Sequence, residues 1–109
     1  MTYNPTYAVD GPDRAEIAAL PGPLLLEFGV DWCPHCQGAQ PAIAAALRDY
    51  PALRHVKVED GPGRPLGRAF RVKLWPTLIL LHDGQETARV VRPTDVSDVS
   101  GILSAVAAG

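Results

Sequence analysis

The sequence predicts an α/β protein whose central mixed β-sheet is flanked by helices on both faces. Three segments lead to this prediction. The almost entirely apolar segment 24–30 is typical of a strand that is covered on both faces. Segment 34–50 carries apolar residues at steps of three and four, which indicates a long helix. Segment 77–91 combines β-prone residues with Asp83-Gly84, a pair typical of a hairpin turn.

The first half of the chain supplies a helix, a strand and a second helix. Residues 12–20 suit a short helix with acidic residues in its first turn, and strand 24–30 follows. The long helix should run over 34–50, with Pro34 at a first helical position where proline is tolerated. Pro41 lies two turns inside this helix and should kink it, because proline has no N–H to donate.

The second half alternates between strand and helix and ends in a helix. Residues 55–58 form a short strand, and 66–70 can form one or two helical turns. Strands 77–81 and 87–91 form the hairpin. A closing helix should follow Thr94-Asp95, which resembles an N-cap. The expected order after the opening residues is therefore α, β, α, β, α, β, β, α.

Composition limits the class of protein. The 109 residues suit one domain over 1–109, and 47% hydrophobic residues are enough for a core. A net charge of −2 gives no electrostatic reason to expect nucleic acid or an anionic membrane as partner. No apolar run approaches the length of a membrane span, and Met1–Pro5 lacks the pattern of a signal peptide. We therefore expect a cytoplasmic monomer.

The two cysteines, Cys33 and Cys36, are the most informative residues. Two cysteines cannot build a disulfide framework or close a structural zinc site of four ligands, so redox chemistry is favoured. An inert buried pair and a metal-binding dithiol stay open as alternatives. Cys33 lies at the helix start, where free N–H groups favour a thiolate, and His35 can add a donor or positive charge. Cys36, almost one turn inside, suits the role of resolving thiol.

Glu27 is a lone carboxylate in an otherwise apolar strand. Desolvation should raise the pKa of Glu27, and a raised pKa would let it exchange a proton with Cys36. In the alternative interpretation, Glu27 only pairs with Lys57 so that two buried charges compensate each other.

Several motifs in this order resemble the thioredoxin family over about residues 5–107. The resemblance covers the stretch Phe28–Cys33 with tryptophan before the first cysteine, the helix proline Pro41, the loop Trp75-Pro76-Thr77, the turn Asp83-Gly84, and the buried pair Glu27 and Lys57. It implies the thioredoxin fold and a protein-disulfide oxidoreductase that contributes to cell redox homeostasis and electron transport. It also implies protein disulfide or dithiol substrates and a reductase as electron donor, with no cofactor and no metal.

The resemblance also implies which residues meet the substrate. Pro76 should follow a cis peptide bond and place the Trp75 backbone beside the cysteines, ready to pair with an extended substrate segment. Trp32 is expected to be an exposed contact residue, with a place in the core as the alternative. Arg92 stands where thioredoxins have a glycine beside the substrate groove.

The sequence departs from the family between the cysteines, where Pro34 and His35 replace the Gly-Pro of ordinary thioredoxins. Cys-Pro-His-Cys resembles the oxidising disulfide donors of the bacterial periplasm. Those proteins carry a large helical insertion, for which the 39 residues between Cys36 and Pro76 leave no room. Three interpretations follow: a general dithiol reductant, a more oxidising disulfide donor or isomerase, and a non-catalytic binding module.

Overall fold

The computed structural model describes residues 3–108 and places the elements in the predicted order. The elements are α1 (Arg14–Ala19), β1 (Pro23–Gly29), α2 (Pro34–Leu47), β2 (Arg54–Glu59), α3 (Pro65–Ala69), β3 (Thr77–His82), β4 (Gln85–Val91) and α4 (Val96–Ala108). Met1, Thr2 and Gly109 lie outside the described residues, so the expectation for the N-terminal residues and the outer bounds of the predicted domain are not tested there.

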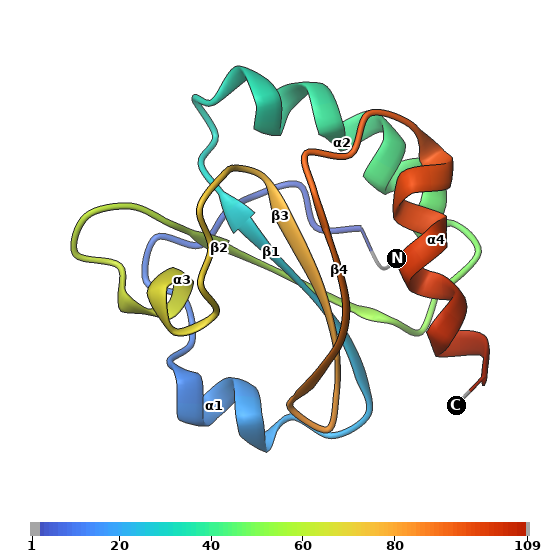
Figure 1. Cartoon of the computed structure of the whole chain (residues 1–109), viewed down its shortest axis with the longest axis horizontal. Coiled ribbons are helices and arrows are strands. Elements are labelled where there is room, and N and C mark those ends of the chain that lie inside the picture. Colours follow the sequence, from blue (N-terminus) through green and yellow to red (C-terminus); the bar gives the residue numbers. More distant parts are fainter. Residues whose placement is uncertain (1–2, 109) are drawn as a thin grey trace.

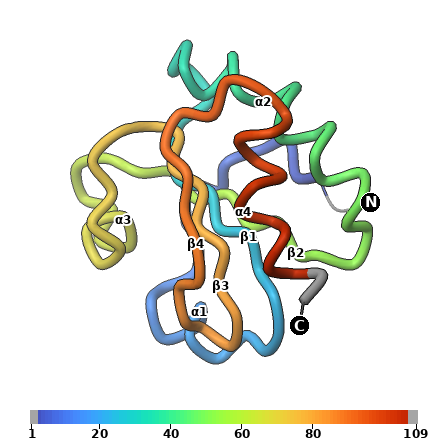
Figure 2. Tube along the Cα trace, turned by 45° about the vertical axis from the view of Figure 1, so that its right-hand side comes forward, coloured from blue at the N-terminus to red at the C-terminus, as the bar shows by residue number. Residues whose placement is uncertain are grey.

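The four strands form one mixed sheet in the order β2-β1-β3-β4. Strand β1 pairs in parallel with β2 and antiparallel with β3, and β3 pairs antiparallel with β4. Helices α2 and α4 lie on one face of this sheet and α1 and α3 on the other (Figures 1 and 2). The predicted sandwich of a mixed sheet between helices is therefore confirmed.

The two faces of the sheet carry separate apolar cores. Alternate residues of β1 and β3 point to opposite faces, as the period of two in a strand requires. The core between the sheet and helices α2 and α4 consists of Leu25, Ala39, Ile43, Ala46, Leu47, Leu53, Leu78, Leu80, Val99 and Leu103. The core between the sheet and helices α1 and α3 consists of Ile17, Leu24, Leu26, Phe28, Val58, Leu66, Phe70, Ile79 and Leu81. The central strand β1 is thus covered on both faces, as its apolar sequence predicts.

Helix α2 ends three residues earlier than the sequence pattern predicts, at Leu47 rather than Tyr50. The N–H of Arg48 donates to the carbonyl of Ala45, and the N–H of Tyr50 to that of Leu47, so the last turn tightens to three-residue spacing. Pro51 has no N–H to continue the helix. Pro41 lies inside α2, which continues on both sides of it.

The N-terminal segment lies alongside β2, at the edge of the sheet. The N–H of Ala8 donates to the carbonyl of Lys57, and the N–H of Glu59 donates to the carbonyl of Ala8. This pairing holds the side chain of the preceding residue, Tyr7, in the interior, where it is 3% exposed. No helix within residues 3–108 is long and apolar enough to span a bilayer.

Candidate active site

The two cysteines lie at the start of α2, just after the end of β1. Cys33 is the N-cap of α2 in extended conformation, and its carbonyl accepts the N–H of Gln37 at 2.9 Å. Pro34 is the first helical residue, as predicted. Both thiols are free; Cys33 is 6% exposed and Cys36 is 1% exposed. The pair is therefore a dithiol whose first sulfur has the greater access to solvent.

The surroundings of Cys33 favour its thiolate. Burial alone would raise the pKa of Cys33, but hydrogen bonds from the Cys36 backbone, the Cys36 thiol and the His35 backbone act against it. The positive charge of Arg92 acts in the same direction. Together they hold the pKa of Cys33 below its usual value, as expected for a thiol at a helix start.

The imidazole of His35 is not the group that the structure places at the sulfur. The His35 side chain is exposed, and residues 3–108 include no hydrogen bond or ion pair made by it. The donor is the backbone N–H of His35, which lowers the pKa of Cys33. The donor at residue 35 is therefore the main chain and not the expected imidazole, because the first N–H groups of a helix have no partner inside it.

Cys36 has the opposite environment. Burial is the largest cause that raises the pKa of Cys36, which reaches about 11. Hydrogen bonds that the Val30 backbone and the Tyr7 hydroxyl give to the deprotonated sulfur partly oppose this rise. A Cβ atom at Gly29 would lie 2.6 Å from the Cys36 sulfur and 2.6 Å from the Tyr7 hydroxyl oxygen, so only glycine fits beside these two atoms.

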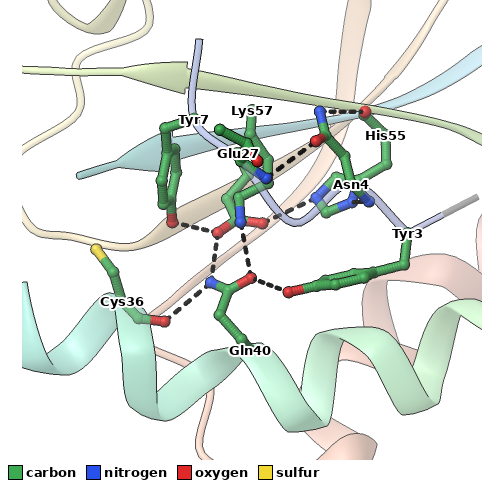
Figure 3. A network of polar contacts seen from close by, with 9 residues as sticks. Tyr3, Asn4, Tyr7, Glu27, Cys36, Gln40, His55 and Lys57 are labelled. Atoms are coloured by element: carbon green, nitrogen blue, oxygen red, sulfur yellow. Dashed lines mark hydrogen bonds and ion pairs between the residues drawn. The ribbon is translucent and has the colours of Figure 1, made fainter. Parts of the chain in front are cut away.

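Glu27 is fully buried, and its carboxylate lies near Tyr7, Gln40 and His55 (Figure 3). Its carboxylate accepts three hydrogen bonds from three different parts of the chain. The Tyr7 hydroxyl and Gln40 Nε2 (2.9 Å) donate to Oε2, and His55 Nε2 lies 2.8 Å from Oε1. The network therefore joins the N-terminal segment, α2 and β2 around one carboxylate of β1.

The hydrogen bonds around His55 fix its tautomer. The backbone N–H of Asn4 donates to His55 Nδ1 at 2.9 Å, so Nδ1 is an acceptor and carries no proton. The proton of the neutral ring then lies on Nε2, which donates it to Glu27. His55 is therefore a neutral hydrogen-bond donor to Glu27.

The sequence prediction of a raised pKa for Glu27 is wrong. Burial does raise the pKa of Glu27, but the hydrogen bond and electrostatic attraction of His55, the positive charge of Lys57 and the hydrogen bond from Tyr7 outweigh it. The net result is a pKa below the ordinary glutamate value. Desolvation was the only effect visible in the sequence, because the donors come from distant segments.

Glu27 and Lys57 favour each other's charge, as the alternative interpretation expects. The two residues are register partners in β1 and β2, but residues 3–108 contain no ion pair between them. Lys57 Nζ instead donates to Gln40 Oε1 at 2.9 Å, and Gln40 in turn donates to Glu27. Burial lowers the pKa of Lys57, and the negative charge of Glu27 works against that.

Trp32 and Trp75 form the surface beside Cys33. Trp32 is 72% exposed, so the alternative of a core position is wrong. The two indole rings meet edge to face with centroids 5.9 Å apart, and Trp75 Nε1 donates to Asp60 Oδ2 at 2.8 Å. The peptide bond between Trp75 and Pro76 is cis, as predicted.

Arg92 borders the same surface. It adopts a positive φ of 52°, the left-handed conformation that favours the glycine of the family pattern. Its Nε donates to the Trp75 carbonyl and its backbone N–H to the Pro76 carbonyl, each at 2.8 Å. Arg92 therefore hydrogen-bonds part of the Trp75 backbone, which the family resemblance expects to pair with the substrate.

Sequence reasoning missed the three donors to the Glu27 carboxylate. Tyr7 lies in a segment with no periodic pattern, and Gln40 is a polar residue on a helix. His55 had a usable signal, because residues 55 and 57 point to the same face of a strand. No group of three or more His, Cys, Asp or Glu residues within 3–108 is placed to hold a metal ion.

Comparison with known proteins agrees with this geometry. A family model described as thioredoxin matches residues 13–105. A thioredoxin from Chlamydia trachomatis is 32% identical over 84 residues, covering 76% of this chain and 81% of that protein. Thioredoxin Asp f 28 from Aspergillus fumigatus is 23% identical over 108 residues, covering 99% of this chain and 100% of the relative.

A solved structure is more similar still. Thioredoxin 2 from Pseudomonas aeruginosa PAO1, in its reduced form, shares 53% identity, with a TM-score of 0.86. The match covers 98% of this chain and 100% of that one. The thioredoxin fold implied by the sequence motifs is therefore confirmed.

The lowered pKa of Glu27 predicts how Glu27→Gln changes stability with pH. A carboxyl with a folded pKa below its unfolded pKa stabilises the fold above the unfolded value, and this contribution is lost as pH falls through the folded pKa. The variant should lose about 1.5–3 kcal/mol at neutral pH, and the difference should shrink in acid. Urea unfolding at several pH values measures it; a difference that is constant or grows in acid would contradict a lowered pKa.

Proposed function

Because the chain belongs to the thioredoxin family and is a thiol–disulfide oxidoreductase, we propose that Cys33 and Cys36 carry the exchange, with Cys33 as nucleophile. The observation that supports this assignment most is the opposite shift of the two thiols. The pKa of Cys33 is lowered and that of Cys36 is raised to about 11, although the residues are three apart. The Cys33 sulfur is thus the more easily ionised of the two and suits the first attack, and the Cys36 sulfur stays protonated until the second step.

The proposed reaction has two steps. The Cys33 thiolate attacks a substrate disulfide, one substrate sulfur leaves as a thiol, and a mixed disulfide with Cys33 forms. Cys36 then loses its proton and attacks the Cys33 sulfur, which releases the second substrate thiol and leaves a Cys33–Cys36 disulfide. Glu27 is the base we propose for this second step, and Lys57 supports it by keeping a positive charge near the network.

We propose that substrates dock on the surface around Cys33. Exposed Trp32, the Trp75 ring and the backbone before Pro76 supply apolar area and main-chain groups. Arg92 would release the Trp75 carbonyl when a substrate backbone takes its place. Pro34 and His35 form the rim of the site at the start of α2.

We further propose a general dithiol reductant, kept reduced by a reductase and acting on protein disulfides. A cytoplasmic monomer forming one domain over 1–109 fits the composition, and the net charge of −2 gives no reason to add nucleic acid or membrane partners. A more oxidising role is the second candidate, favoured by the donors that stabilise the Cys33 thiolate, since a stabilised reduced form raises the potential. A non-catalytic binding module does not fit an oxidoreductase that keeps both thiols.

Alkylation of the reduced protein with iodoacetamide at neutral pH tests the assignment of the nucleophile. A thiol with a pKa of about 11 is only about 0.01% ionised at pH 7, so Cys33→Ser should slow alkylation at least tenfold. The matched variant Cys36→Ser should react about as fast as wild type. If Cys33→Ser were alkylated at the wild-type rate, Cys33 would not be the nucleophile.

Replacement of His35 by proline tests what sets the redox potential. His35→Pro removes the backbone N–H that hydrogen-bonds Cys33, so it should raise the pKa of Cys33 and make the protein a weaker oxidant. His35→Ala keeps this N–H and should change the potential much less. Equilibration with glutathione should show a shift of about threefold to tenfold in the equilibrium constant for His35→Pro. Equal shifts in both variants would assign the effect to the imidazole instead.

A further inference from the structure

Tyr7 lies between the resolving thiol and the buried carboxylate. Its backbone is held beside β2 through Ala8, and its ring reaches inward, where it is 3% exposed. The hydroxyl donates to Glu27 Oε2 (Figure 3). The same hydroxyl lies near the Cys36 sulfur, because a Cβ at Gly29 would be 2.6 Å from both atoms, and a hydrogen bond between the two groups contributes to the pKa shift of each.

Glu27 has no direct contact through which it could take the proton of Cys36. Residues 3–108 contain no hydrogen bond from the Cys36 sulfur to the Glu27 carboxylate. Gln40 does bridge the two residues, because its Nε2 donates to Glu27 Oε2 and to the Cys36 carbonyl. That amide donates on both sides and offers the sulfur no acceptor, so it cannot pass a proton along.

We propose that Tyr7 relays the proton from Cys36 to Glu27 when the mixed disulfide is resolved. This inference rests on the proposed function, in which Cys36 attacks the Cys33 sulfur. The Cys36 thiol gives its proton to the Tyr7 oxygen while Tyr7 gives its own proton to Glu27. The electron pair left on Cys36 forms the bond to Cys33, and the substrate sulfur leaves with the pair of the broken bond. Glu27, ionised at rest, afterwards returns its proton to solvent.

On the path from Cys36 through Tyr7 to Glu27, each group can donate a proton to the next. A hydroxyl has one proton to give and free lone pairs to accept another, and an ionised carboxylate only accepts. Because neutral His55 donates to Oε1 and Gln40 to Oε2, Glu27 is held in place as the acceptor. Tyr7 therefore has its proton turned toward Glu27 and a lone pair left for the thiol.

Tyr7 is also kept from holding a charge of its own. Burial and the nearby Glu27 raise the pKa of Tyr7 far above the ordinary tyrosine value, so it must gain one proton as it gives the other. The charged or titratable groups that face it are Glu27 from β1, Cys36 from α2 and Lys57 from β2, whose Nζ lies 4.2 Å from the ring centroid. The positive charge of Lys57 favours the negative charge that develops on the sulfur.

Solvent offers a competing route for the proton on this side of the site. A cleft of about 150 Å³ is bordered by Tyr7, Cys36, Gln40 and Lys57 among others. Cys36 itself is only 1% exposed, which limits attack by water on its proton. Without the hydroxyl of Tyr7, the proton should leave through this cleft to hydroxide, and the reaction should then depend on pH.

Rapid mixing of reduced protein with dithiobis(nitrobenzoate) separates the two steps. The first coloured thiolate is released when Cys33 attacks, and the second is released when Cys36 resolves the mixed disulfide. The coloured thiolate leaves without needing a proton, so the rate of the second phase reports the deprotonation of Cys36. Tyr7→Phe should slow the second phase about 100-fold and leave the first unchanged. Tyr3→Phe, which removes a hydroxyl bonded to Gln40 at 2.7 Å in the same network, should stay within about twofold of wild type.

The pH profile distinguishes a relay from a merely structural hydroxyl. From about pH 6 to about pH 9 the second phase should be nearly flat in wild type, because Glu27 is ionised throughout, and should rise about tenfold per pH unit in Tyr7→Phe. A second phase with the wild-type rate and profile in Tyr7→Phe would overturn the relay. Absence of the first phase in wild type would instead overturn the proposed function.

If Tyr7→Phe does not fold, wild-type protein in mixtures of light and heavy water provides the test. Two protons move together in the relay, so the rate of the second phase should fall along a curve as the deuterium fraction rises. A straight line, which means that one proton moves, would overturn the relay.

Discussion

A buried negative charge is the constraint on which the rest of this structure depends. An ionised carboxylate inside a protein costs several kcal/mol unless hydrogen bonds and a counter-charge compensate it. Glu27 is fully buried in the central strand, and its three donors come from the N-terminal segment, from α2 and from β2. Any change that displaces one of these segments leaves the charge uncompensated. The network therefore ties the edge of the sheet to the helix that carries both cysteines.

The same network explains why two thiols three residues apart behave differently. Cys33 meets the start of α2, where backbone N–H groups and the charge of Arg92 stabilise a thiolate. Cys36 lies in the interior near Tyr7 and the buried Glu27, and burial keeps its thiol protonated. In the proposed reaction, the helix start prepares the Cys33 sulfur for attack, and the interior keeps Cys36 as a thiol until the second step.

Much of the fold follows from sequence pattern, and part of the site does not. The apolar run of β1, the helical stripe of α2 and the Asp83-Gly84 turn each carry a local signal, so the order of elements was predictable. The cysteines and Glu27 stood out for the same reason. The partners of Glu27 carry no such signal, since Tyr7 is 20 residues and His55 is 28 residues away along the chain. The direction of the Glu27 pKa shift depends on those partners, which is why desolvation alone predicted it wrongly.

The protonation state of Glu27 is the central claim, because the relay and the role of Lys57 both depend on it. Carbon-13 NMR of the glutamate side-chain carboxyls in the reduced protein, titrated with acid, measures it directly, and Glu27→Gln assigns the signal. We expect the Glu27 carboxyl to stay ionised throughout the neutral range and to protonate only below the ordinary glutamate pKa. A Glu27 signal that titrates near neutral pH would contradict this account.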